Sequence, residues 1–349
     1  MIFNAYAVLA AFVAVVEGIL GSWVTGLALR ALRAHRTGGT PDPGAEDGRL
    51  VRALLPSFVL LGVSVASWPL LYLLLDSYVP EWPGVMCIQG VTRIGTGSLG
   101  AAGWLPSLVR ILQTTKPALV FATGAWLVLH LANRRTRTAP WRSGVLALVA
   151  ATGALAVVDA SAQLAYVGIP KKESFLARGC CTVDTQSRVL EASNGGNGAA
   201  RDAGSRRGAL VAFYGVALAV VLGGMRAARR APAQLVGNRR AALPLAVGAL
   251  LSLPVGAWFL TEVAAPAFLR LEAHHCAYCL LAKAPLGVLG IVLFLGGAFA
   301  LGWASILRSL APLDEERERV GTQARALLCA GLCGYVGALL IVSIRLALP

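Results

Sequence analysis

Cysteine and histidine are the residue types in this sequence whose spacing could do chemistry, and they are densest in one short run. His274-His275-Cys276-Ala277-Tyr278-Cys279 places two thiols at CxxC spacing directly before an apolar stretch. Two thiolates at this spacing can bind one soft metal ion, and neighbouring imidazoles can complete its shell. A helix N-terminus also acidifies a thiol, which suits thiol–disulfide exchange. An oxidising compartment would equally permit a structural disulfide.

Three further cysteines lie in the other long polar segments of the chain. Cys180 and Cys181 are adjacent, so a disulfide between them would close a strained ring. The two thiols could instead clasp a soft ion such as Cu(I) or pair with different loops. With Cys87 and the two cysteines of the CxxC run, the polar segments hold five cysteines, an odd number that disulfides within one monomer cannot all pair. The predicted ligands for copper or zinc are Cys87, Cys180, Cys181, Cys276, Cys279, His274 and His275.

The elements that must position these residues are apolar runs. The 349-residue chain is 57% hydrophobic and only 14% charged, whereas a soluble domain carries about 25% charged residues. Each run is long enough to cross roughly 30 Å of hydrocarbon as a helix. We therefore expect an all-α, polytopic transmembrane bundle that forms a single integral membrane domain, 1–349. Its eight spans are predicted near 4–29, 53–78, 117–133, 143–167, 208–225, 242–264, 284–307 and 326–347.

The distribution of lysine and arginine predicts the orientation. The loops at 30–52, 134–142, 226–240 and 308–325 hold 18 basic residues in 65 positions, whereas the alternate segments hold 12 in 100. Basic loops stay in the cytoplasm, so both termini are expected outside, in a multi-pass protein of a bacterial inner membrane. The cysteine-bearing outer loops are then 79–116, 168–207 and 265–283. The net charge of +14 is topogenic and does not indicate a nucleic-acid partner.

Four acidic residues fall within or at the ends of the predicted spans. Intramembrane carboxylates are costly, which makes them functional candidates. Glu17 is near the middle of the first span and is expected to face the bundle interior, to pair or to stay protonated. Asp159 and Glu262 lie nearer the outer side and could support the cysteine loops or relay protons. Asp76 ends the second span.

The stretch Cys276-Ala277-Tyr278-Cys279-Leu280-Leu281 at the outer start of a span resembles the active-site hairpin of the vitamin K epoxide reductase family and of the analogous DsbB proteins. The resemblance covers about residues 273–300. It implies electron transfer between protein thiols and a quinone, with Cys276 as the exposed nucleophile and Cys279 as its resolving partner. That family also uses a second, separated cysteine pair and a four-helix core, where this chain has a vicinal pair, Cys87 and eight predicted spans.

Three functions follow as hypotheses. The first is capture or handling of a soft metal outside the membrane. The second is a membrane thiol–disulfide oxidoreductase that uses the CxxC with a quinone. The third is a non-catalytic membrane subunit with structural disulfides in its outer loops. The expected partners are the lipid bilayer, other membrane subunits or an extracytoplasmic metal or thiol protein.

Overall fold

The chain folds into long, mostly apolar helices. The computed structural model describes residues 4–36, 43–82, 85, 87–95, 100–134, 141–170, 198–270, 275–310 and 316–348. Every regular element in these ranges is a helix, and eight helices are long and apolar enough to cross a membrane. This confirms the all-α, multi-pass prediction. Where the sequence suggested one domain, the structure has two compact units, Met1–Cys180 and Cys181–Pro349, each described by itself.

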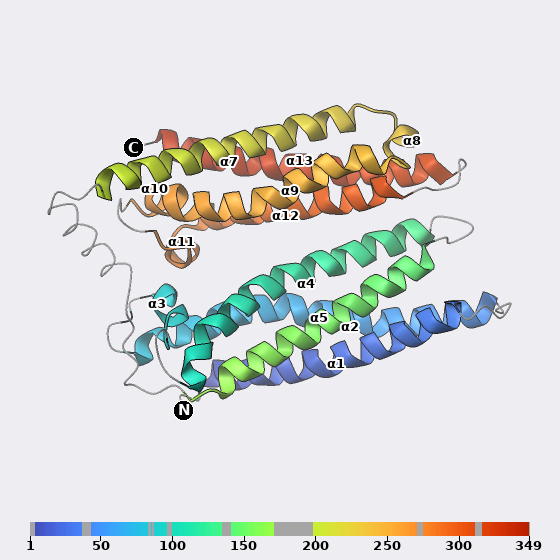
Figure 1. Cartoon of the computed structure of the whole chain (residues 1–349), viewed down its shortest axis with the longest axis horizontal. Helices are drawn as coiled ribbons and strands as arrows, with labels where there is room; N and C mark the ends of the chain where they lie inside the picture. The colour runs from blue at the N-terminus through green and yellow to red at the C-terminus, as the bar shows by residue number, and fades with distance from the viewer. Residues whose placement is uncertain are drawn as a thin grey trace. The chain divides into compact units, whose positions relative to one another are not determined.

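The first unit is built on four long helices that lie alongside one another (Figure 1). Helix α1 packs against both α2 and α5, and α4 packs against α5. Helices suit these apolar runs because they satisfy their own backbone groups in lipid. The elements of this unit are α1 (Ala5–Arg36), α2 (Pro43–Ser77), η1 (Val79–Glu81), α3 (Ile88–Thr92), η2 (Ala101–Trp104), α4 (Leu105–Arg134) and α5 (Arg142–Gly168).

Helix α4 begins earlier than the sequence predicted. The span was expected to start at 117, yet the helix starts at Leu105 and the apolar segment extends over Ala101–Arg134. The polar run 113–116 followed by Pro117 has the pattern of a helix start, because proline is favoured in a first turn. Here Pro117 lies inside the helix, so residues 105–116, predicted to be outer loop, are helical.

The second unit also contains four long helices. Helix α12 packs against α9 and α13, and α7 packs against α9 and α13, so the four close a ring. The short helices α10 and α11 lie at one end of it (Figure 1). The elements of this unit are α7 (Gly198–Ala228), α8 (Pro232–Leu235), α9 (Arg239–Phe259), the π-helical turn η3 (Leu260–Ala264), α10 (Ala265–Leu269), α11 (Ala277–Lys283), α12 (Pro285–Ser309) and α13 (Arg317–Ala347).

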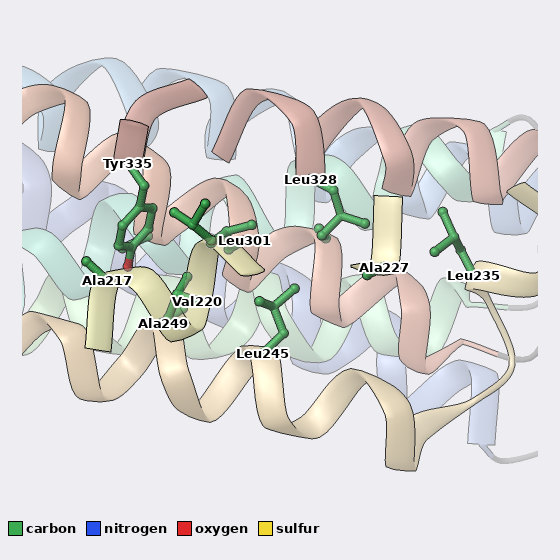
Figure 2. Close-up of a cluster of buried hydrophobic side chains, with 12 residues drawn as sticks. Ala217, Val220, Ala227, Leu235, Leu245, Ala249, Leu301, Leu328 and Tyr335 are labelled. Carbon is green, nitrogen blue, oxygen red and sulfur yellow. The ribbon is translucent and has the colours of Figure 1, made fainter. Parts of the chain in front are cut away.

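Small and branched apolar side chains fill the centre of this second ring, together with one tyrosine. Figure 2 shows Leu301 and Leu328 packed along this core, with the Tyr335 ring reaching toward α9. The Tyr335 hydroxyl lies 2.5 Å from Ser252 Oγ. Ser252 Oγ donates its own hydrogen to the Ala249 carbonyl, 2.7 Å away. The tyrosine is therefore the donor, and the bond satisfies its hydroxyl in the apolar interior.

Tyr335→Phe is expected to lower the free energy of unfolding by about 0.5–1.5 kcal/mol, the usual net worth of one such hydrogen bond. The change removes the hydroxyl and leaves the ring in place. Denaturant titration of the purified protein in mixed micelles measures the loss. Tyr6→Phe is the control, because Tyr6 is 43% exposed on α1, and it should be neutral.

Candidate functional site

The CxxC run forms a compact turn on the short helix α11, which precedes α12. Cys276 is the N-cap of α11, and its Sγ accepts a hydrogen bond from the Cys279 backbone N–H at 3.4 Å. The Sγ atoms of the two cysteines lie within 4.8 Å of one another. Cys276 is 1% exposed and Cys279 is half-buried. Cys279 is therefore the more accessible residue, the reverse of what the resemblance to the vitamin K epoxide reductase family implied.

A single leucine anchors this turn in the core of the second unit. Leu280 follows Cys279 directly, is fully buried and packs with Phe213 and Phe259. Gly287 on α12 makes room for it, since a Cβ there would lie 2.7 Å from Leu280 Cδ2. The position of the two sulfurs is therefore set by packing on the bundle.

A π-helical turn at the end of α9 sets the orientation of the neighbouring histidine. In η3 the Ala265 N–H donates to the Leu260 carbonyl, one residue further back than in an α-helix. The Thr261 carbonyl would then accept from residue 266, which is a proline and has no N–H. Pro266 thus leaves the Thr261 carbonyl without a helical donor.

His275 forms a hydrogen bond with this carbonyl. Its Nδ1 lies 3.1 Å from Thr261 O, and because a carbonyl oxygen can only accept, Nδ1 must carry the hydrogen. In a neutral ring the lone pair is then on Nε2. A carbonyl bonded to the other ring nitrogen is the usual outer-shell support of a metal-binding histidine. The second unit thus presents two neighbouring sulfurs and, directly before them in the chain, an imidazole in a tautomer that can bind metal.

An apolar cavity of about 190 Å³ lies behind the turn within the same unit. Leu280 lines it, so it adjoins α11 one residue beyond Cys279. Four aromatic rings also line it, and a cavity of this kind accepts a flat apolar ring. Those rings belong to Phe213, Phe259, Phe268 and Phe294.

The remaining predicted ligands lie outside the described part of the second unit. Cys87 belongs to the first unit, where it is the N-cap of α3 with an extended backbone. Cys180, Cys181 and His274 lie outside the described residues. Their roles remain predictions from the sequence.

The predicted intramembrane acids have different environments. Asp76 is exposed in the last turn of α2. Glu262 lies in η3 and accepts a hydrogen bond from Ser205 of α7 at 3.2 Å. Glu17 and Asp159 are fully buried in the first unit.

Asp159 forms a buried ion pair that the sequence had not indicated. Lys116 of α4 places its Nζ 2.6 Å from Asp159 Oδ2, with the side chains 1% and 0% exposed. Thr115 donates a hydrogen bond to the other carboxylate oxygen. The ammonium also donates to Ser67 Oγ and to Gln163 Oε1, both at 3.0 Å. All three of its hydrogens therefore have acceptors.

This polar cluster extends to α1, so that all four long helices of the first unit contribute. Gln163 donates to the Ala10 carbonyl at 3.0 Å, and Ser64 donates to Glu17 Oε1 at 2.6 Å. Glu17 Oε2, by contrast, has no hydrogen-bond partner among the described residues. Glu17 therefore faces the bundle interior, as one of the sequence-based alternatives had it.

Sequence reasoning missed Lys116 and Thr261. The sequence predicted Lys116 at the end of an outer loop, and the signal for its burial was its place well inside the apolar segment Ala101–Arg134. The signal for Thr261 was Pro266, because a proline frees the carbonyls of the turn before it.

Comparison of the chain with models of known protein families, with curated proteins and with solved structures found no match.

Proposed function

We propose that this membrane protein binds a soft metal ion, Cu(I) or Zn(II), through Cys276, Cys279 and His275. The observation that carries the proposal is the pair of sulfurs within 4.8 Å of one another. His275 directly precedes Cys276 in the chain, and its Nδ1 is already bonded to a carbonyl, which leaves Nε2 as the nitrogen that would bind the ion. Two thiolates that share one zinc ion at about 2.3 Å each lie at most about 4.6 Å apart. A separation below 4.8 Å is therefore compatible with one shared ion.

The donor set decides the class of metal. Thiolates and imidazole select copper(I) and zinc, whereas magnesium and calcium need oxygen ligands. Two thiolates and one imidazole leave a coordination position open on a tetrahedral ion, as in sites that exchange a ligand. Cys87, Cys180, Cys181 and His274 are the predicted additional ligands. An open site of this kind suits capture of the ion from a donor protein.

Metal content measures the proposal directly. Full-length protein, reduced and purified in detergent without oxygen, is incubated with zinc chloride or with Cu(I) in the presence of a competing chelator. After desalting, we expect one ion per chain. Cys276→Ser/Cys279→Ser should weaken binding by more than roughly 100-fold, beyond the 10–100-fold typical of losing an outer-shell partner.

The chain supplies its own matched control. Cys329 and Cys333 are a second pair on α13, exposed and four residues apart. Cys329→Ser/Cys333→Ser removes the same number of thiols and should keep wild-type metal binding. Equal loss of metal in both double variants, or no metal in the wild type, would refute the proposal.

A thiol–quinone oxidoreductase is the second candidate, and the aromatic cavity beside α11 favours it. Oxidation of the Cys276–Cys279 dithiol to a disulfide releases two electrons and two protons, which reduce a quinone to the quinol. Thiol trapping after anaerobic addition of a short-chain ubiquinone tests it. Quinone-dependent loss of both thiols in metal-free protein supports this candidate. Thiols already oxidised, metal-free and unreactive would instead support structural disulfides.

A further inference from the structure

Three arginines surround one cavity at the end of the second unit where α7 and α12 finish. Arg226 and Arg230 lie in and just after the last turn of α7, and Arg308 lies in the last turn of α12. All three line a cavity of about 490 Å³. Among the described residues that line it there is no aspartate or glutamate, so these residues give the cavity positive charge.

Arg308 is the strongest sign that this cavity takes a ligand. Its side chain is 3% exposed, and Nη2 donates to the Ala241 carbonyl of α9 at 2.9 Å. Its Nε and Nη1 are buried and have no hydrogen-bond partner in the part of the chain that the structure describes. A buried cation with unused donors is costly unless an anion completes it. The anchored guanidinium therefore presents unused hydrogen-bond donors at the cavity.

The rest of the cavity wall is apolar and follows the groove between α7 and α9. On α7 it extends from Arg230 back to Val216, which spans about 21 Å at 1.5 Å per residue. Leu245 and Leu251 line it from α9. Gly223 opens the groove further, since a Cβ there would meet nothing within 4 Å. The positively charged end of the cavity complements an anionic lipid head group, and the apolar groove that continues from it complements an acyl chain.

We propose that this cavity binds an anionic phospholipid, with the phosphate at Arg308, Arg226 and Arg230 and an acyl chain along the α7–α9 groove. Arginine is well suited to phosphate because its planar fork matches two phosphate oxygens. Basic pockets between transmembrane helices on the cytoplasmic side bind such head groups. The loops 226–240 and 308–325 are two of the four that the charge distribution predicts to be cytoplasmic. This site is separate from the Cys–His turn and does not depend on it.

Lipid titration of the whole protein tests the assignment. Delipidated protein in detergent is titrated with phosphatidylglycerol or phosphatidylcholine, and bound lipid is counted by native mass spectrometry. We expect phosphatidylglycerol to bind at least about 10-fold more tightly. Arg226→Gln/Arg230→Gln should reduce that affinity about 10-fold, and Arg308→Gln should reduce it further.

The control removes equal charge from neighbouring positions that do not line the cavity. Arg229 and Arg240 are both exposed, and neither lines the cavity. Arg229→Gln/Arg240→Gln should bind phosphatidylglycerol within about twofold of wild type. If Arg308→Gln does not fold, the Arg226/Arg230 double variant, which changes only exposed side chains, still decides the outcome.

Three outcomes would overturn the proposal. Equal loss in the two double variants would mean that general surface charge attracts the lipid. Equal affinity for the two phospholipids would exclude recognition of net negative charge. Displacement of phosphatidylglycerol by millimolar inorganic phosphate, with the same dependence on the cavity arginines, would assign the site to a soluble phosphate.

Discussion

Lys116→Met is expected to lower the free energy of unfolding by about 3–5 kcal/mol, the cost of breaking a buried ion pair by removing one partner. Methionine is close to lysine in length, so little packing is lost. The variant leaves Asp159 buried without its cation, and it removes the ammonium that bonds Ser67 and Gln163. SDS titration of the protein in mixed micelles, followed by helical circular dichroism, measures the loss.

A double variant separates the charge from the packing. Lys116→Met/Asp159→Leu removes both charges, and buried pairs replaced by apolar residues are often neutral or more stable. We expect it to recover more than half of the stability lost in the single variant, although Thr115 and Ser67 keep polar groups without their former partners. Lys283→Met is the control, because Lys283 is exposed, and it should change stability by less than about 0.5 kcal/mol. A cost below about 1 kcal/mol for Lys116→Met would contradict a buried pair.

Gly153→Ala is expected to cost roughly 1–3 kcal/mol, as overpacking of a close interface does. Gly153 of α5 lies against Gly21 of α1, and a Cβ on it would stand 2.7 Å from the Gly21 carbonyl oxygen and 2.5 Å from Thr25 Oγ1. Thr25 also donates to the Gly21 carbonyl at 2.7 Å. Close backbone approach through small residues is how membrane helices associate, and alanine would force α1 and α5 apart.

A glycine-to-alanine substitution at an open position of the first unit should not lower the free energy of unfolding. A Cβ at Gly62 of α2 would meet nothing within 4 Å. Gly62→Ala gains helix propensity, which is worth up to about 1 kcal/mol, so it should be neutral or stabilising. The micelle titration used for the Lys116 variants compares the two. Equal effects of Gly153→Ala and Gly62→Ala would mean that the α1–α5 contact is looser than described.

The two candidate sites depend on different structural features of the second unit. The Cys–His turn depends on a local break at Pro266 and on the single anchor Leu280. The arginine cavity depends on three helix ends that meet, with Arg308 held by the α9 backbone. Each can therefore be altered without disturbing the other, and the metal and lipid experiments are independent.

The sequence by itself determined the eight membrane helices and the cysteine spacing. Apolar length is a local property of the chain, and in lipid such a run has no alternative to a helix. The run from Cys276 to Cys279 likewise needed only four residues to bring its sulfurs near each other. The limit of local reasoning shows at 105–116, where the polar run before Pro117 has the pattern of a loop and is helix, with Thr115 and Lys116 buried.

The tertiary structure alone decided which polar groups meet. Lys116 and Asp159 are 43 residues apart, and His275 and Thr261 are 14 apart. Whether such a group is buried, and what satisfies it, depends on the neighbours that packing supplies, which composition and periodicity do not encode. The sequence thus named Asp159 and His275 as candidates, but only packing paired the first with Lys116 and bonded the second to the Thr261 carbonyl.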